Sequence, residues 1–251
     1  MHPRISYLIY ATPRCGSYLL CEALINTRLA GRPAEYFGQP QTETMLKRWG
    51  LTGYEQCLAI IFKEGTTPNG VFGGKIIWPS FEDFINHLRE IPGCETLPVP
   101  ELMSTIFPHL RHIWISRRDK VRQAISHWKA IQTDVWMVAR SQRSSEKAVI
   151  FNYNVIERLR RSIEYDEQEM QEYFTACDIQ PFKVVYEDFV HDYQETIQQI
   201  LNYLHIPVPK NLASAEQQLK KQANEQSEMW VQRYYELKPQ KREDPSKNLL
   251  L

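Results

Sequence analysis

Residues 5–18 read ISYLIYATPRCGSY and join an apolar run to a turn of small and polar residues. Ile5 to Ala11 has the length and the continuous apolar character of a strand that is covered on both faces of a sheet. Ser17 to Asn26 then places leucines and alanines on one stripe at helical spacing. A strand, a tight turn and a helix N-terminus in this order favour an anion site, because unpaired backbone N–H groups and the positive end of the helix dipole meet there.

Three further β-rich runs and several helical segments follow this unit along the chain. The runs cover residues 74–77, 112–116 and 182–186, and helices are predicted over 54–64, 80–89, 99–107, 121–133, 152–177, 192–204 and 225–237. Strands separated by helices indicate parallel pairing with right-handed crossovers. We therefore expect an α/β fold with a central, mostly parallel sheet of four to five strands flanked by helices. One domain is expected over residues 1–237, with a polar, flexible tail at 238–251.

The composition excludes several classes of protein. The chain has 251 residues, and its 30 basic and 30 acidic side chains give a formal net charge of zero. This balance gives no electrostatic reason to expect nucleic acid or an anionic membrane as a partner. The first apolar run is too short for a membrane span or a secretory signal, so we expect a cytoplasmic protein. Five scattered cysteines without a CxxC pair argue against a disulfide framework and against a zinc site.

The turn at residues 12–18 lacks the features of a nucleoside-triphosphate loop. The GxxxxGK[ST] pattern is absent, and no apolar strand ends in an aspartate suited to Mg²⁺. The turn instead offers the Arg14 guanidinium, the Ser17 hydroxyl and backbone N–H groups to an anion. An ordinary strand-to-helix turn capped by Ser17 is the alternative.

A second group of polar residues follows the third β-rich run. The run ends in RRD, residues 117–119, and Ser126 lies eight residues beyond Arg118. An arginine at the carboxyl end of a strand and a hydroxyl two turns into the next helix can hold one phosphate between them. Two anion sites at neighbouring strand ends fit a ligand with two separated phosphates. The alternative is a solvated arginine pair at a helix start.

Three motifs in this order resemble the hallmarks of sulfotransferases that use 3′-phosphoadenosine 5′-phosphosulfate. They are TPRCGSY at 12–18, RRDKVRQAIS at 117–126 and VYED at 185–188. More narrowly, the chain is similar to bacterial trehalose 2-sulfotransferases. The segments that carry this likeness are GRPAEYF at 31–37, GTTPNGVFGGKIIW at 65–78, SHWKAIQTDVW at 126–136 and QANEQSEMWVQRYY at 222–235. They span nearly the whole chain in the order of the family.

The resemblance implies a P-loop-like sulfotransferase fold, 3′-phosphoadenosine 5′-phosphosulfate as co-substrate, and no metal. Arg118 and Ser126 would hold the 3′-phosphate, and Tyr186 would line the adenine pocket. We expect Cys15 to contact the donor only through its backbone N–H group. The residues around the 5′-phosphosulfate would be Pro13, Arg14, Cys15, Gly16, Ser17 and Tyr18.

The resemblance also gives Glu35 the role of general base toward the acceptor hydroxyl. From the residues alone, a capping or surface carboxylate is the alternative. Many sulfotransferases use a histidine two residues after a lysine on the next strand, but Lys75 is followed here by two isoleucines. Arg14 suits stabilisation of the charge that develops on the bridging oxygen. Lys75 is either a stabiliser of the leaving phosphate or a strand-edge lysine in water.

The acceptor-binding residues that the resemblance implies are Arg32, Pro33, Ala34, Glu35, Tyr36, Phe37 and Gly38. Three of them, Arg32, Ala34 and Gly38, depart from the family pattern, and Tyr18 stands where a smaller threonine is usual. We expect a trehalose-like carbohydrate or a related small molecule with a hydroxyl as acceptor, and a homodimer as in the family. The other hypotheses are a small-molecule kinase with a degenerate phosphate loop and a non-catalytic nucleotide-binding homologue.

Overall fold

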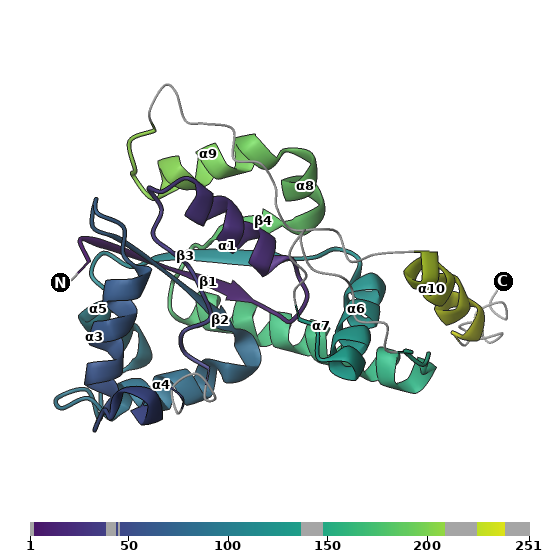
Figure 1. The fold of residues 1–251 in the computed structure, drawn as a ribbon, viewed down its shortest axis with the longest axis horizontal. Coiled ribbons are helices and arrows are strands. Elements are labelled where there is room, and N and C mark those ends of the chain that lie inside the picture. The colour runs from purple at the N-terminus through teal and green to yellow at the C-terminus, as the bar shows by residue number, and fades with distance from the viewer. Residues whose placement is uncertain (1–2, 39–43, 45, 137–147, 209–224, 239–251) are drawn as a thin grey trace, which may run out of the picture.

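A computed structural model of the chain describes residues 3–38, 44, 46–136, 148–208 and 225–238. The strand β1 (Ile5–Ala11) lies between β2 (Val71–Ile77) and β3 (Arg111–Ser116), and β4 (Phe182–Val185) pairs with β3. The order of these four strands is β2-β1-β3-β4, and every pair is parallel. Since parallel strands point the same way, the carboxyl ends of all four meet at one edge of the sheet (Figure 1).

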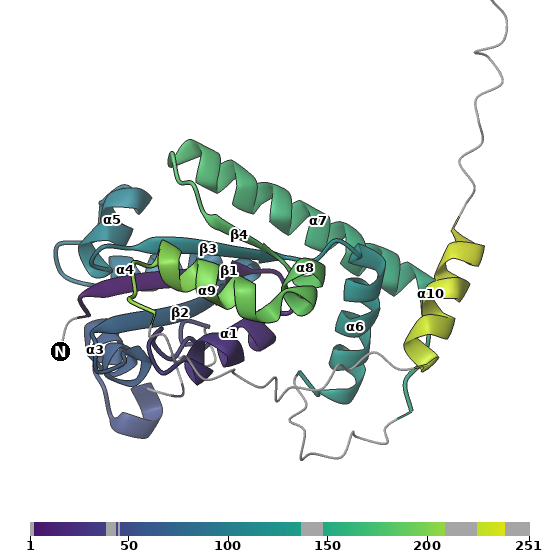
Figure 2. The same cartoon turned by 90° about the horizontal axis from the view of Figure 1, so that it is seen from above.

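Helices cover both faces of this sheet, as continuous apolar strands require (Figures 1 and 2). One face packs on α1 (Ser17–Asn26), α8 (Tyr186–His191) and α9 (Tyr193–Tyr203). The other face packs on the helices α3 (Tyr54–Gly65), α4 (Phe81–Arg89) and α5 (Val99–Ile106), and on the C-terminal half of α7 (Tyr153–Ala176). A short 3-10 turn, η1 (Trp78–Ser80), joins β2 to α4. The expected α/β architecture is therefore confirmed.

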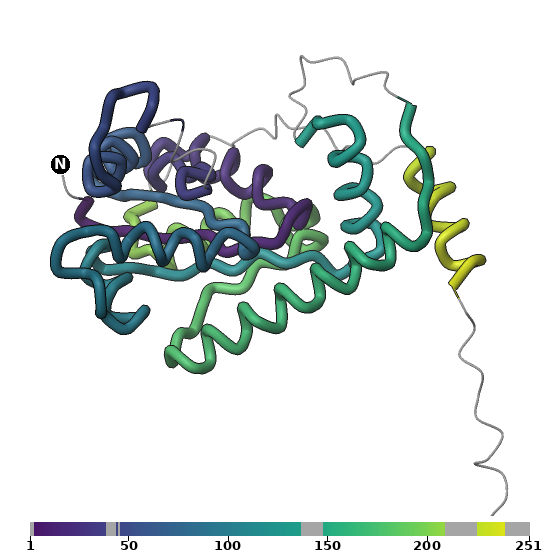
Figure 3. Tube along the Cα trace, turned by 90° about the horizontal axis from the view of Figure 1, so that it is seen from below, coloured from purple at the N-terminus to yellow at the C-terminus, as the bar shows by residue number. Residues whose placement is uncertain are grey.

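A third apolar cluster lies beyond the carboxyl ends of the strands. It joins α6 (Lys120–Thr133), the N-terminal half of α7 and α10 (Glu225–Leu237) around buried residues such as Ile125, Ile156 and Trp230. Figure 3 shows these helices at the end of the molecule that faces away from the N-terminus. The start of α6 thus lies at the edge of the sheet where the turn after β1 also lies.

The observed elements differ from the predicted ones mainly at β2 and β4. Strand β2 begins at Val71 rather than at residue 74, because its glycines pack closely against neighbours: a Cβ on Gly73 would lie 2.5 Å from the Tyr7 hydroxyl oxygen. Tyr186 was predicted as the end of a strand, but it is the first residue of α8. The helices end within two residues of their predicted limits. Most of the predicted tail, residues 239–251, lies outside the described residues.

Candidate active site

The turn after β1 forms the N-terminus of α1 and leaves its backbone donors open. Gly16 is the N-cap, with φ of 100°, and no side chain among the described residues caps this helix end. A Cβ on Gly16 would overlap the ring of Tyr186, so both the backbone conformation and the space demand glycine. Gly16 has no side chain that could cap the first N–H groups of α1, and such a helix start suits an anion.

Helix α6 holds this turn in place through three hydrogen bonds, two from Gln123 and one to Ser126. The buried Gln123 amide donates to the Thr12 hydroxyl at 2.9 Å and to the Pro13 carbonyl at 2.8 Å. Arg14 Nε donates to the Ser126 hydroxyl oxygen at 3.0 Å. The structure thus brings the two motifs that the sequence analysis singled out, 112 residues apart, into direct contact.

Arg14 is largely removed from water and carries a positive charge at the edge of the sheet. Its guanidinium also donates to the carbonyl of Trp136. Burial lowers the pKa of Arg14, and the neighbouring Arg117 adds to this effect, yet a guanidinium stays charged at neutral pH. The neighbouring His127 is neutral there, because burial and the charge of Arg14 lower its pKa to about 4. An anion is the ligand that would best offset this positive charge.

The segment between β3 and α6 is bound by the YED residues that follow β4. The Glu187 carboxylate accepts from the backbone N–H of Arg118 at 3.0 Å and of Asp119 at 3.2 Å. The Arg118 guanidinium is paired with Asp188, and both side chains are more than half exposed. Arg118 is thus paired with a carboxylate and Ser126 with Arg14, so their joint binding of a 3′-phosphate stays a prediction.

Tyr186 lies against the turn at residues 12–18 from the side of β4. The space beside Gly16 is filled by its ring, and the Arg117 guanidinium lies 4.9 Å from the centroid of that ring. This cation–π contact orders the start of α8 against the segment between β3 and α6. The predicted role of Tyr186 in an adenine pocket stays a prediction.

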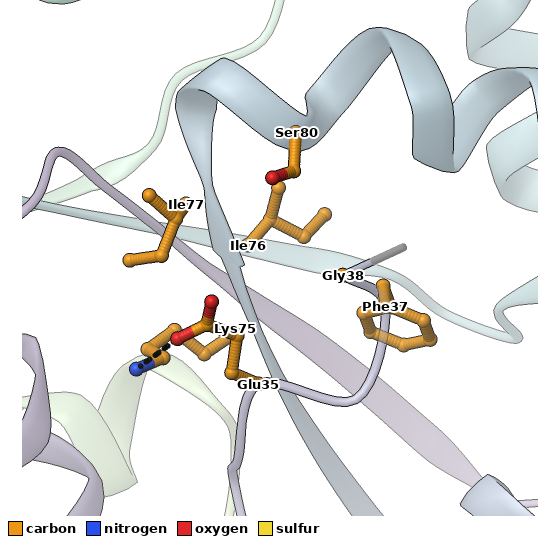
Figure 4. A pocket seen from close by; sticks show the side chains of 7 residues that line it. All are labelled: Glu35, Phe37, Gly38, Lys75, Ile76, Ile77 and Ser80. Carbon is orange, nitrogen blue, oxygen red and sulfur yellow. Dashed lines mark ion pairs between the residues drawn. The ribbon is translucent and has the colours of Figure 1, made fainter. Parts of the chain in front are cut away.

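The carboxylate of Glu35 lies 3.0 Å from the Lys75 ammonium (Figure 4). Glu35 comes from the extended segment after α1, which lies beside β2 because the Lys75 N–H donates to the Ala34 carbonyl at 2.9 Å. The Lys75 side chain has no exposure, whereas 27% of the Glu35 side chain is exposed. The hypothesis of a strand-edge lysine in water is therefore wrong, and Glu35 is an ion-paired carboxylate rather than a helix cap.

The Lys75 ammonium also lies 3.5 Å from the centroid of the Tyr18 ring. Burial works to lower the pKa of Lys75, but the interactions with Cys21, Glu35 and Tyr18 outweigh it and raise the pKa above its ordinary value. Lys75 is therefore a cation throughout the physiological pH range. The sequence analysis singled out Tyr18 as a departure from the usual residue in the turn. It did not reveal the contact between the Tyr18 ring and Lys75.

A small pocket contains part of the predicted acceptor segment. Glu35, Phe37, Gly38 and Lys75 line it, together with Ile76, Ile77 and Ser80 from the end of β2 and from η1 (Figure 4). The Phe37 ring itself is buried, 4.6 Å from the centroid of Phe84. The pocket thus combines an apolar wall with an ion-paired carboxylate.

The remaining residues of the acceptor segment lie outside this pocket. Arg32 is exposed and donates to the Glu64 carbonyl at 3.4 Å, and the Tyr36 hydroxyl donates to the Arg32 carbonyl at 2.7 Å. Pro33 is buried and Ala34 is half-buried beside β2. These four residues shape the path of the segment, and a contact with an acceptor stays a prediction for them.

Cys15 is buried beneath the turn, and burial raises the pKa of its thiol. A protonated thiol agrees with the expectation that only its backbone takes part. No group of three or more His, Cys, Asp or Glu side chains suited to a metal ion occurs among the described residues. In that same part of the chain, no helix is both long and apolar enough to cross a membrane.

The sequence analysis missed the residues that support the turn and the pocket from other elements. Gln123 fixes the turn after β1. The feature of the sequence that could have identified it is an amide side chain within the buried stripe of α6. Ser80 and Ile77 line the pocket only because β2 ends beside Glu35. No local sequence pattern predicts that Ile77 and Ser80 line the pocket, because they belong to a strand end and to a 3-10 turn.

The parallel sheet, the uncapped helix N-terminus after β1 and the carboxylate–ammonium pair define an α/β protein with a candidate site at the carboxyl edge of its sheet. The chain belongs to the Stf0 sulphotransferase family, whose model matches residues 6–236. It is 28% identical to a trehalose 2-sulfotransferase of Mycolicibacterium smegmatis, over 93% of this chain and 95% of that relative. It is 27% identical to the enzyme of the same name from Mycobacterium tuberculosis, over 91% and 93% of the two chains.

Two solved structures are also similar to this chain. The sulfotransferase domain from the Synechococcus PCC 7002 olefin synthase is 14% identical, with a TM-score of 0.41, over 85% of this chain and 78% of that one. The sulfotransferase domain from the curacin biosynthetic pathway is 16% identical, with a TM-score of 0.43, over 86% and 79% of the two chains.

Proposed function

We propose that this protein transfers the sulfuryl group of 3′-phosphoadenosine 5′-phosphosulfate to a hydroxyl of a carbohydrate or a related small molecule. Membership of a sulfotransferase family supports the reaction class. The observation that carries the proposal is the position of Glu35: it is a partly exposed carboxylate beside β2, paired with the buried Lys75 ammonium, which also contacts Tyr18 in the turn after β1.

The residues present fit a donor with two anionic ends. The N–H groups at the start of α1 and the Arg14 guanidinium offer positive charge to the 5′-phosphosulfate. Arg118, at the neighbouring strand end, offers a bidentate donor to the 3′-phosphate once it leaves Asp188. When bound, this co-substrate supplies an activated sulfuryl group, and the chain supplies position and charge.

The chain's own part in the reaction centres on one proton and one developing charge. Glu35 takes the proton of the acceptor hydroxyl as the new oxygen–sulfur bond forms and the bond from sulfur to the bridging phosphate oxygen breaks. The Glu35 oxygen Oε2 faces Lys75, which leaves Oε1 for the acceptor. Arg14 donates a hydrogen bond to the bridging oxygen, on which negative charge grows. One such donor lowers the activation barrier by roughly 3 to 4 kcal/mol.

The acceptor is the less sharply defined partner. Both curated relatives are named for trehalose, a disaccharide, which favours a carbohydrate acceptor. Arg32, Ala34 and Gly38 depart from the family pattern, so we expect the hydrogen bonds to the acceptor to differ from those in the relatives. Ile76 and Ile77 in the pocket wall suit the apolar face of a sugar ring or of a hydroxylated natural product.

Three further predictions belong to this proposal. A homodimer is expected from the family resemblance, and a cytoplasmic location from the family and from five free cysteines among the described residues. A single domain over residues 1–237 is expected because each described helix packs on the sheet or on its neighbours. The molecular mass from size-exclusion chromatography tests the homodimer, and limited proteolysis tests the single domain.

The test of the proposed function is a transfer assay with a panel of acceptors. The protein is incubated with 3′-phosphoadenosine 5′-phosphosulfate and a set of sugars and hydroxylated metabolites, with and without a metal chelator. Accurate mass spectrometry then separates a sulfuryl increment from the nearly isobaric phosphoryl one. Sulfated product that persists in chelator supports the proposal. Phosphorylated product from magnesium and ATP would instead assign a kinase, and adenylate binding without any transfer would assign a non-catalytic homologue.

A further inference from the structure

The positive charge of the buried Lys75 ammonium is compensated by the Glu35 carboxylate. The side chain has no exposure, and the ammonium lies 3.0 Å from Glu35 Oε2. Among the described residues, Glu35 is the carboxylate that pairs with this ammonium. A flexible four-carbon chain with a point charge needs a further contact to hold one position.

The Tyr18 ring supplies that further contact. The ammonium lies 3.5 Å from the ring centroid, well within the range of a cation–π interaction. Tyr18 is the second residue of α1, so the ring position is fixed by the same helix start that forms the phosphate turn. The ring is 37% exposed, whereas the cation beneath it is not exposed at all. Tyr18 therefore covers Lys75 on one side while Glu35 faces it on another.

We propose that Tyr18 is a positioning residue for the base: the face of its ring holds the Lys75 ammonium against Glu35 and so fixes the orientation of the carboxylate. This inference rests on the proposed function only for the role of Glu35. The contact between ring and cation stands on geometry alone. The phenol hydroxyl is not needed for it, since the attraction comes from the ring quadrupole.

The inference gives Tyr18 a role that differs from that of the turn around it. The backbone N–H groups of the turn face an anion, whereas the Tyr18 side chain faces a cation. A side chain without a ring at this position leaves the ammonium with the ion pair alone and opens it to water. The Lys75 amine then becomes more reactive, and the Glu35 carboxylate loses a fixed partner.

The first experiment measures Lys75 directly and needs no enzymatic activity. The wild type and the variants Tyr18→Phe and Tyr18→Leu are acetylated with a limiting amount of an N-hydroxysuccinimide ester, and the extent at each lysine is read by peptide mass spectrometry. Lys63, exposed on α3, is the internal control. We expect Lys75 to react at the wild-type rate in Tyr18→Phe and roughly threefold to thirtyfold faster in Tyr18→Leu, the range that one cation–π contact spans.

The second experiment uses the transfer assay on the same proteins. Tyr18→Leu is expected to lower kcat relative to Tyr18→Phe by about the same factor as it raises Lys75 labelling relative to Tyr18→Phe. The KM for the donor should change less than kcat, because the turn's backbone is unaltered. Thermal unfolding confirms the fold of each variant, and Tyr18→Met serves as a second ring-free variant if Tyr18→Leu does not fold.

The outcomes separate the two proposals. Equal Lys75 labelling in wild type and Tyr18→Leu overturns the role of Tyr18, whatever the activity. A Tyr18→Phe variant that behaves like Tyr18→Leu also overturns it, because the hydroxyl and not the ring would then be responsible. The expected labelling pattern in a protein that transfers no sulfuryl group upholds the contact and refutes the proposed function.

Discussion

Glu35 and Lys75 form an ion pair of 3.0 Å in which the cation is fully buried and the carboxylate is 27% exposed. This asymmetry decides what the pair can do. A buried ammonium cannot readily give up its position to water, whereas an exposed carboxylate oxygen remains open to a hydroxyl from the pocket. In the proposed reaction Lys75 would orient Glu35 as the base, and the pair joins the segment after α1 to β2.

Replacing Glu35 by Gln tests the base. The amide keeps the size of the side chain but cannot accept a proton, so kcat is expected to fall by roughly 10²- to 10⁴-fold. Binding of adenosine 3′,5′-bisphosphate, measured by isothermal titration calorimetry, should stay within about threefold of the wild type because Glu35 faces the pocket and not the turn. A variant with near wild-type kcat would refute the role of Glu35.

Replacing Lys75 by Met separates stability from activity. Methionine fills a similar volume without a charge, and a buried pair is often no more stable than an apolar substitute. The free energy of unfolding in urea is therefore expected to change by less than about 1 kcal/mol, while kcat falls at least about tenfold. Glu35→Gln, which leaves the buried cation without its counter-ion, should lose more stability than Lys75→Met, and the double variant should recover stability but not activity. Equal loss of stability in both single variants would contradict this account.

Replacing Gly16 by Ala tests the turn. The residue has φ of 100°, and a Cβ there would overlap the Tyr186 ring. We expect a loss of roughly 1 to 3 kcal/mol in the free energy of unfolding and a weaker affinity for adenosine 3′,5′-bisphosphate, because the N–H groups of α1 shift. Gly53→Ala is the matched control, since Gly53 has φ of −163° and nothing lies within 4 Å of its added Cβ. Wild-type affinity in Gly16→Ala would show that the turn does not hold the donor.

Replacing Asp188 by Asn tests whether Arg118 is held back from an anion. The Arg118–Asp188 pair is exposed on both sides, and such pairs contribute about 0 to 1 kcal/mol. Release of the guanidinium should therefore tighten the binding of adenosine 3′,5′-bisphosphate by up to about fivefold at low salt, and less at high salt. Asp192→Asn removes one negative charge nearby and is the control. Unchanged affinity in Asp188→Asn, together with unchanged affinity in Arg118→Ala, would remove Arg118 from the binding site.

His112 makes the stability of the fold depend on pH. Burial lowers its pKa to about 4, and its Nδ1 lies 3.0 Å from the hydroxyl of the fully buried Tyr10. The folded pKa lies below the unfolded value of 6.5, so the unfolded state binds the proton first as the pH falls. The stability that the neutral imidazole gives is complete above about pH 6.5, and about 2 kcal/mol of it is lost near pH 5.

Denaturant unfolding at several pH values measures this effect. The wild-type curve contains a similar contribution from His127, whose pKa is also lowered to about 4, so the comparison with His112→Gln isolates one residue. The variant should show a shallower decline between neutral pH and pH 5 than the wild type. His191→Gln, at a side chain that is 85% exposed, controls for the loss of an imidazole. Parallel curves for His112→Gln and the wild type would contradict the assignment.

Much of the fold could be predicted because its signals are local. The apolar run at Ile5–Ala11, the small residues after it and the helical stripe from Ser17 each depend on neighbours within a few residues. The two clear differences arise where packing overrides local preference. Gly73 weakens the pattern of a strand, so the strand was predicted only from residue 74, yet β2 begins at Val71 and the Tyr7 side chain fills the space beside Gly73.

The features of the candidate site also fall into those that the local sequence predicts and those that depend on packing. The sequence by itself determined that a glycine and serine turn follows the first strand, that Arg118 follows the third, and that no histidine follows Lys75. Only the tertiary structure decided which partner each charged side chain contacts: Arg14 with Ser126, Arg118 with Asp188, and Lys75 with both Glu35 and Tyr18. The physical reason is that an ion pair or a cation–π contact depends on distances of a few ångströms between segments far apart in the chain, and those distances are set by the packing of helices on the sheet.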